Sequence, residues 1–159
     1  MNSSFALRPE IEADATFRRI LFRQSKGAAL SELPLPPDML ERILEQQFNA
    51  QTQGYRATYP AGRFEIIEMD QVPVGRLATH RGPQSLHLID IALLADRRGR
   101  GVGGAILGAL MDEARALSLP MTLHVDRDNL AAQRLYQRLG FVLASADETY
   151  LGLRWPAAE

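Results

Sequence analysis

The stretch DRRGRGVGGAILGAL, residues 96–110, brings four glycines and three arginines together within residues 97–104, just before an apolar helical pattern. Glycine costs about 1 kcal/mol relative to alanine inside a helix, so this clustering at a helix start needs an explanation. The first N–H groups of a helix have no partner and lie at the positive end of its dipole. Without side chains around them, an anion can approach these groups closely. The stretch therefore predicts a phosphate-binding turn, with a plain glycine-rich surface turn as the alternative.

A dinucleotide-binding turn is a second interpretation, because GRGVGG (99–104) matches the pattern G-x-G-x-x-G between a strand and a helix. Two features count against it. The strand pattern stops at Leu94, which leaves four residues before the first glycine where a tight turn is needed. Only 33 residues follow Asp126, too few for the remaining strand–helix units of such a sheet. A Walker phosphate loop is excluded because no Lys-Ser or Lys-Thr follows the glycines.

The composition of the chain is that of an ordinary globular domain, with 159 residues of which 46% are hydrophobic and 23% charged. The net charge of −1 argues against general affinity for nucleic acids. Lys26 is the only lysine among 18 basic residues. The absence of cysteine excludes disulfides, a thiol nucleophile and a zinc–thiolate site, and we expect no metal centre. No signal-peptide pattern or long apolar run occurs, so we expect no membrane span and a cytoplasmic location.

Helical and strand-like hydrophobic patterns alternate along the chain. We expect one α/β domain over residues 1–159, with a mixed sheet flanked by about four helices in the order strand, two helices, three strands, helix, strand, helix, two strands. The expected strands are 5–8, 63–69, 74–80, 85–94, 121–125, 141–145 and 149–155. Four helices are expected. The first begins at Asp14, and the second begins at Asp38 and ends at Gly54. The third covers 102–118, and the fourth runs from Asp128 or Asn129 to Gly140.

Apolar spacing on the first three helices predicts which residues face the core. The expected buried residues are Phe17, Ile20 and Leu21 on the first, Leu40, Ile43, Leu44, Gln47 and Phe48 on the second, and Ile106, Leu107, Leu110, Met111, Ala114 and Leu117 on the third. Residues 25–37 are expected to form a loop. In the strand 85–94 the apolar alternation shifts by one residue after position 88, which predicts a β-bulge.

Two segments resemble the signatures of the GCN5-related N-acetyltransferase (GNAT) superfamily. Arg98-x-x-Gly101-x-Gly103 is similar to its pyrophosphate-binding motif, R/Q-x-x-G-x-G/A. LHVDRDNLAAQRLYQRLGF (123–141) resembles its second signature, in which a strand leads to an asparagine and then to a helix. The matching positions there are Asn129, Leu135, Tyr136, Leu139, Gly140 and Phe141. The resemblance is strong over residues 85–155, whereas over the first 60 residues only the order strand–helix–helix matches.

This resemblance implies a splayed sheet in which strands 86–94 and 121–125 run parallel and then diverge around acetyl-CoA. The pantetheine arm of the cofactor would follow the backbone near Ile91 and Leu93. The pyrophosphate would lie on N–H groups of the glycine turn, neutralised by arginines, and the asparagine would hydrogen-bond the cofactor arm. The implied cofactor-binding residues are Ile91, Leu93, Arg98, Gly99, Arg100, Gly101, Val102, Gly103, Gly104 and Asn129.

The implied reaction is direct acetyl transfer from acetyl-CoA to a primary amine of a small molecule or peptide. The resemblance places Tyr136 as the acid that protonates the departing thiolate. The alternative is that Tyr136 is a core residue, because apolar side chains share its helical face. Tyr55 and Tyr59 are candidates to line the acceptor side. The general base stays open, and the candidates are His87, Asp90, Glu68 and water.

Two other functions remain as alternatives at this stage. One is a non-catalytic regulatory module that binds acyl-CoA and needs no acceptor pocket. The other is a small dinucleotide-binding protein. The expected partner is an amine acceptor, without nucleic acid or membrane, and the sequence leaves open whether the chain forms a homodimer.

Overall fold

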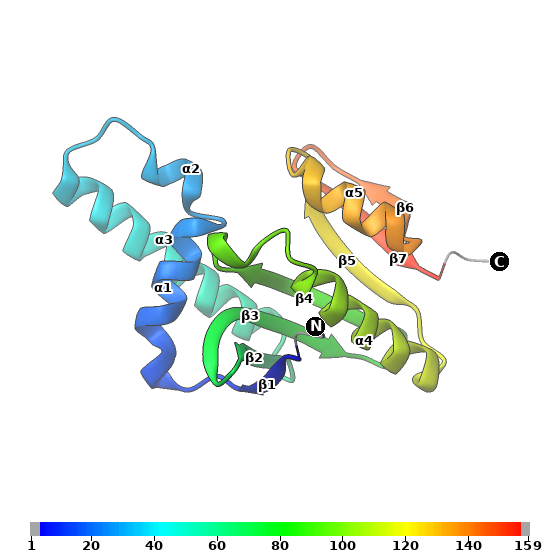
Figure 1. The fold of residues 1–159 in the computed structure, drawn as a ribbon. Coiled ribbons are helices and arrows are strands. Elements are labelled where there is room, and N and C mark those ends of the chain that lie inside the picture. Colours follow the sequence, from blue (N-terminus) through cyan, green and yellow to red (C-terminus); the bar gives the residue numbers. More distant parts are fainter. Residues whose placement is uncertain (1–3, 157–159) are drawn as a thin grey trace. The chain divides into compact units, whose positions relative to one another are not determined.

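A computed structural model of the chain describes residues 4–156 and contains seven strands (Figure 1). The strands are β1 (Ala6–Pro9), β2 (Arg63–Met69), β3 (Val72–Arg81), β4 (Leu86–Leu93), β5 (Met121–Asp126), β6 (Val142–Ala146) and β7 (Tyr150–Trp155). The helices are α1 (Ala15–Gln24), α2 (Ala28–Ser31), α3 (Pro37–Thr58), α4 (Val102–Leu117) and α5 (Leu130–Leu139), with short 3-10 helices η1 (Glu12–Asp14) and η2 (Ala95–Arg97).

The strands form one mixed sheet in the order β1-β2-β3-β4-β5-β7-β6. β4 and β5 pair in parallel, from Leu86 opposite Met121 to Leu88 opposite Leu123. The pairs β1–β2, β5–β7 and β6–β7 are antiparallel. The predicted mixed sheet and the order of strands and long helices are confirmed. The β-bulge predicted in the strand 85–94 stays a prediction.

The described chain divides into two compact units, each considered by itself below. The first comprises residues 4–78 and 90–102, and the second residues 79–89 and 103–156. The prediction of a single domain over 1–159 stays a prediction, and its end segments 1–3 and 157–159 lie outside the described residues. No helix among residues 4–156 combines the length and the apolar character needed to cross a bilayer.

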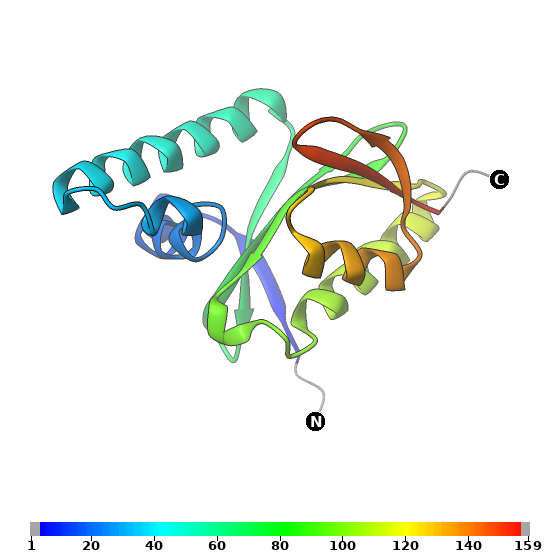
Figure 2. The same ribbon diagram turned by 90° about the horizontal axis from the view of Figure 1, so that it is seen from above.

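In the first unit, helices α1 and α3 lie side by side (Figure 2). Phe22 on α1 and Phe48 on α3 meet edge to face, with ring centroids 5.9 Å apart, and Leu44 is buried with them. Edge-to-face aromatic pairs add about 0.5–1.5 kcal/mol beyond the area that they bury. The burial predicted for Ile20 and Gln47 is wrong, since both are exposed. The residue that the pattern missed is Phe22, whose packing on Phe48 sets the rotation of α1.

Two further predictions in this unit are wrong. Helix α3 does not end at Gly54 but continues to Thr58. One helical glycine costs only about 1 kcal/mol, which the remaining helical hydrogen bonds offset. Residues 25–37 are not all loop, because α2 forms at Ala28–Ser31. Leu30 of α2 packs against the Phe22–Phe48 cluster, and this burial supports the short helix.

In the second unit, α4 buries the predicted apolar stripe except for its last member. Ile106, Leu107, Leu110, Met111 and Ala114 are all buried. Leu117 is 50% exposed, so its predicted burial is wrong. It is the last residue of α4, and the chain leaves the helix through Ser118 at a φ of 58°. Asn129 caps α5, and Gly140 ends it at a φ of 100°.

Candidate functional site

The glycine turn follows β4 and η2 and leads directly into α4. Gly99 and Gly101 have φ values of 73° and 82°, a conformation that other residues rarely adopt. A Cβ added at Gly99, Gly101 or Gly104 would meet no other atom within 4 Å. Packing therefore does not demand glycine at these positions. The turn exposes backbone to open space at a helix start, as the prediction of an anion site requires.

Helix α4 supplies the N–H groups of this turn. Its first residue, Val102, has a buried side chain that fixes the helix start. The helix is 16 residues long and has no acidic residue in its first turn. The positive end of its dipole is therefore not offset by a carboxylate of that turn, which favours an anionic ligand.

Arg98 holds the turn in place. Its Nε donates to the carbonyl of Leu93 at 3.1 Å, and its Nη2 donates to the carbonyl of Gln24 at 2.5 Å. The Oε1 of Gln24 in turn accepts from the N–H of Ala95 at 2.7 Å. Arg98 therefore links the glycine turn to Leu93 and Gln24, and it is also a candidate to neutralise the charge of the pyrophosphate. Arg100 is exposed, and it has no ion-pair partner among residues 4–156.

The predicted pantetheine-binding residues Ile91 and Leu93 lie in the second half of β4, which belongs to the first unit. The parallel ladder between β4 and β5 covers only the first three residues of β4, Leu86–Leu88. On leaving the strand, the N–H of Leu94 donates to the carbonyl of Val74 at 2.9 Å. Ile91 and Leu93 are half-buried, and the chain continues from them through η2 into the glycine turn.

The second unit carries the other two predicted site residues, Asn129 and Tyr136. The Oδ1 of Asn129 accepts from the N–H of Ala132 at 3.2 Å, so this oxygen caps α5. The Nδ2 group of Asn129 makes no hydrogen bond within residues 4–156. Tyr136 is 7% exposed, and its ring meets that of Phe141 at 5.5 Å between centroids. Tyr136 therefore has a packing role, and its role as the acid stays a prediction.

A cluster of three polar residues occupies the first unit beside β4. The Nζ of Lys26 donates to the hydroxyl of Tyr55 at 2.7 Å and lies 3.9 Å from Oδ1 of Asp90. Burial, and then the charge of Asp90, raise the pKa of the Tyr55 hydroxyl above its ordinary value. The sequence analysis identified Tyr55 as a candidate for the acceptor side and Asp90 as a candidate base, but it did not identify Lys26. The one feature of the sequence that could have drawn attention to Lys26 is that it is the only lysine of the chain.

The other candidates for the base are held by their own partners. Glu68 accepts from Nε of Arg8 at 2.9 Å in the first unit. In the second unit, Nδ1 of His87 lies 2.7 Å from Oγ1 of Thr122. Burial, and then the nearby His124 and His80, lower the pKa of His87 to about 4. His87 therefore binds a proton weakly at neutral pH. Asp90, in the first unit, lies beside the Lys26–Tyr55 pair.

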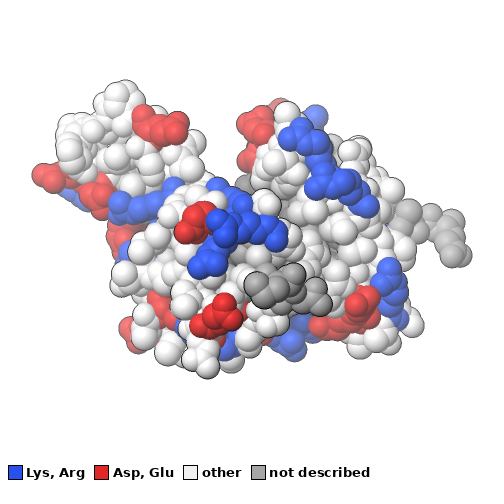
Figure 3. Space-filling view, viewed as in Figure 1, with Lys and Arg blue, Asp and Glu red and all other residues white. Residues whose placement is uncertain are grey.

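Charged side chains of both signs are interspersed on the face seen in Figure 3. Many arginines of the first unit are used in ion pairs, such as Arg19 with Glu45 at 2.9 Å. Among residues 4–156 no group of three or more His, Asp or Glu side chains is arranged to hold a metal ion.

The family comparison assigns most of the chain. Residues 30–141 match the model of the acetyltransferase (GNAT) family. A search of curated proteins gives no match.

Solved structures give the same fold. The PaiA N-acetyltransferase of Thermoplasma acidophilum in complex with coenzyme A aligns with a TM-score of 0.71 at 13% identity, over 95% of this chain and 98% of that one. An acetyltransferase of Thermus thermophilus aligns at 0.68 and 23%, over 97% of both chains. A GNAT acetyltransferase of Elizabethkingia anophelis with acetyl-CoA bound aligns at 0.61 and 10%, over 94% of this chain and 96% of that one. The chain therefore belongs to the GNAT acetyltransferase family, whose acetyl donor is acetyl-CoA.

Proposed function

We propose that the protein is an N-acetyltransferase that moves an acetyl group from acetyl-CoA to a primary amine of a small molecule or peptide. The observation that carries this proposal is the glycine turn, which lies within the matched residues 30–141 and is open at Gly99, Gly101 and Gly104. The similar fold of the PaiA protein, whose name describes an N-acetyltransferase, supports nitrogen as the accepting atom. The family assignment replaces the dinucleotide-binding alternative.

The open glycine turn fits the pyrophosphate of a bound CoA molecule. N–H groups of residues 99–104 and the dipole of α4 would hold the pyrophosphate, with Arg98 and Arg100 adding positive charge. Arg98 would do so through the guanidinium donors that Leu93 and Gln24 leave over. The backbone of Ile91 and Leu93 would pair with the amide groups of the pantetheine arm, and the Nδ2 group of Asn129 would donate to the same arm.

Side chains of this protein would carry out the proton transfers of the reaction. Acetyl-CoA, when bound, supplies an acetyl group activated as a thioester. The hydroxyl of Tyr136 would donate a proton to the sulfur, because a phenol is protonated at neutral pH. Asp90 would accept the proton of the attacking amine, because it lies in the second half of β4 next to Ile91, whereas Glu68 is paired with Arg8. Lys26 lies beside that carboxylate, with its Nζ 3.9 Å from Oδ1 of Asp90.

Two measurements test the proposal. Calorimetric titration should detect acetyl-CoA binding and no comparable binding of NAD. An assay for free thiol, with a panel of primary amines, should then detect acetyl transfer. Acetyl-CoA binding without thiol release for any amine would favour the non-catalytic acyl-CoA-binding module instead. A cytoplasmic location stays a prediction, and whether the chain forms a homodimer stays open.

A further inference from the structure

The single lysine of the chain lies in the first unit, beside the carboxylate proposed as the general base. The Nζ of Lys26 is 3.9 Å from Oδ1 of Asp90 and donates to the hydroxyl of Tyr55 at 2.7 Å. An acceptor amine has to meet that same carboxylate to lose its proton. Relative to Asp90, the amine of Lys26 therefore already lies where the proposed reaction needs an amine.

Hydrogen bonds hold the segment that carries Lys26 close to the residues proposed to bind CoA. The carbonyl of Gln24 accepts from Nη2 of Arg98, and its Oε1 accepts from the N–H of Ala95. Ala95 and Arg98 belong to the connection between β4 and the glycine turn, and all of these residues lie in the first unit. The backbone of Lys26 thus follows, two positions later, a residue that is fixed to this connection.

The side chains of Lys26 and Asp90 differ in exposure. That of Lys26 is 47% exposed, whereas that of Asp90 is 17% exposed. The 3.9 Å between Nζ and Oδ1 is longer than a hydrogen bond, so the two groups face each other without one. A lysine amine sits on a flexible four-carbon stem, and reacting atoms have to approach to about 3–3.5 Å. Lys26 therefore combines an accessible, movable amine with a base that is shielded from water.

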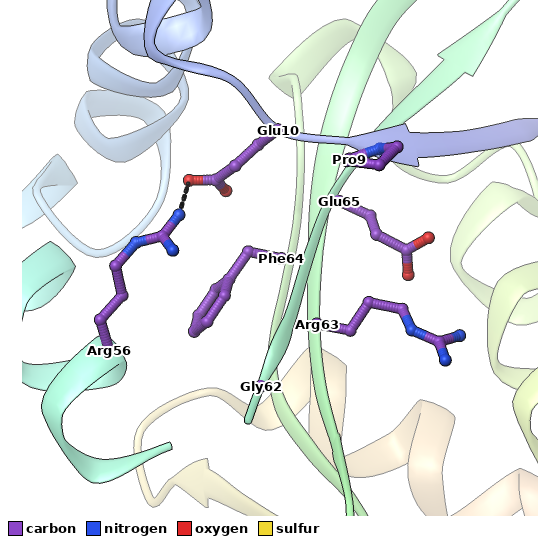
Figure 4. A pocket seen from close by; sticks show the side chains of 7 residues that line it. All are labelled: Pro9, Glu10, Arg56, Gly62, Arg63, Phe64 and Glu65. Carbon is purple, nitrogen blue, oxygen red and sulfur yellow. Dashed lines mark hydrogen bonds and ion pairs between the residues drawn. The ribbon is translucent and has the colours of Figure 1, made fainter. Parts of the chain in front are cut away.

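Lys26 is also the only basic side chain of the protein that can become a nucleophilic amine. The other 17 basic side chains are arginines, whose guanidinium groups stay charged at neutral pH. A hollow of about 450 Å³ in the first unit illustrates this (Figure 4). Arg56 and Arg63 line it, and Nη2 of Arg56 donates to Oε2 of Glu10 at 3.0 Å. Such arginines offer charge but no amine, so a reaction at a side-chain amine is confined to Lys26.

We propose that Lys26 accepts the acetyl group of the acetyl-CoA bound by its own chain, so that the protein acetylates itself at this one side chain. This inference rests on the proposed acetyl transfer. The ammonium of Lys26 gives one proton to Asp90, and the neutral Nζ attacks the thioester carbon. A C–N bond forms, the C–S bond breaks, and a second proton of Nζ goes to the departing sulfur. Asp90 releases its proton to solvent. The product is an amide without the positive charge that faced Asp90.

Digestion with a protease that cuts only after lysine tests this proposal. It cuts the unmodified chain once, after Lys26, and acetylation of Nζ prevents the cut. After incubation with acetyl-CoA and no added amine, the protein should resist the protease, and its intact mass should rise by one acetyl group. The rate constant should saturate with acetyl-CoA and stay independent of protein concentration, because the donor is bound to the same chain. Added CoA should slow the modification by competing for the site.

Two substitutions sharpen the test. Asp90→Asn should slow the modification about 10²-fold or more, the lower end of the usual contribution of a general base. Asp38→Asn, at an exposed aspartate in the first turn of α3, is the matched control and should leave the rate unchanged. Lys26→Arg keeps a positive charge beside Asp90 but has no nucleophilic amine, so its intact mass should not rise.

Four outcomes would overturn the proposal. The chain is still cut after Lys26 following incubation with saturating acetyl-CoA, or Lys26→Arg gains an acetyl group at the same rate as the wild type. Alternatively, the rate constant rises in proportion to acetyl-CoA or protein concentration, or it is unchanged in Asp90→Asn.

Thiol release with the panel of primary amines separates this proposal from the proposed function. If an added amine is acetylated while Lys26 is not, only the self-modification is wrong. If neither is acetylated, the proposed function is wrong as well.

Discussion

The Nε of Arg98 donates a hydrogen bond to the backbone carbonyl of Leu93 at 3.1 Å. With the bond from Nη2 to Gln24, this contact ties the glycine turn to the end of β4 and to the end of α1. One side chain therefore sets the position of the N–H groups proposed to hold the pyrophosphate. Its removal should affect both the charge and the shape of the turn.

Arg98→Ala is expected to weaken acetyl-CoA binding by roughly 1.5–3 kcal/mol, the range for a hydrogen bond to a charged group. Arg100→Ala should have a smaller effect, because within residues 4–156 Arg100 makes none of the hydrogen bonds by which Arg98 holds the turn. Isothermal titration calorimetry measures both. An unchanged affinity in Arg98→Ala would show that this arginine contributes nothing to the phosphate site.

Gly104→Glu is expected to abolish acetyl-CoA binding without unfolding the protein. Gly104 lies in the first turn of α4, and an added Cβ meets nothing within 4 Å, so the substitution adds a carboxylate without a steric clash. The negative charge would repel the pyrophosphate at the helix start. Gly108→Glu, one turn further along the same helix and equally open, is the matched control. Equal loss in both variants would contradict the assignment of the anion site to residues 99–104.

Tyr136→Phe should lower kcat by about 10²- to 10⁴-fold, the usual loss on removing a positioned general acid. The affinity for acetyl-CoA should remain nearly unchanged. Phenylalanine keeps the ring against Phe141, so the packing of α5 is preserved. Steady-state kinetics should show kcat and kcat/KM falling together. A variant with the wild-type rate, where chemistry limits turnover, would identify Tyr136 as a core residue only.

His87 should make the free energy of unfolding depend on pH between about 6.5 and about 4. The ordinary pKa of a histidine side chain is 6.5, and in the folded protein the pKa of His87 is about 4. In this window the unfolded chain binds a proton that the folded chain excludes, so stability falls as pH falls. Above pH 6.5 the group is neutral in both states and contributes no slope.

Urea denaturation at a series of pH values checks this dependence. His87→Gln should give a flatter profile over the same window. Below this pH window, the pH dependence of the free energy of unfolding comes from other groups, such as Asp14, whose pKa Arg8 lowers to about 2. Identical slopes in the wild type and in His87→Gln would contradict the lowered pKa.

The regular elements were predictable because their signals are local. The strand 63–69, the stripe of α4 and the end of α5 at Gly140 each follow from residues within a few positions of one another. The exposure of Ile20 and the burial of Phe22 depend on packing between the separate helices α1 and α3. Hydrophobic spacing on one helix contains no information about that packing.

The features of the candidate site also fall into those with a local sequence signal and those that depend on the folded chain. The glycine turn was recognisable because its chemistry lies in consecutive backbone N–H groups. The use of Arg98 as a link was not, because Gln24 lies 74 positions away in the sequence. The contact of Lys26 with Tyr55 spans 29 positions, and only the folded chain brings these side chains together.

Lys26 gives the protein an unusual chemical property, because it carries the only side-chain amine in the sequence. A reagent that labels lysines therefore modifies one defined side chain, next to the hydroxyl of Tyr55 and the carboxylate of Asp90. A fluorophore or a cross-linker attached there reports on the surroundings of β4 without any engineered cysteine. Conversely, immobilising the protein through its lysine side chain places the support against the proposed acceptor side.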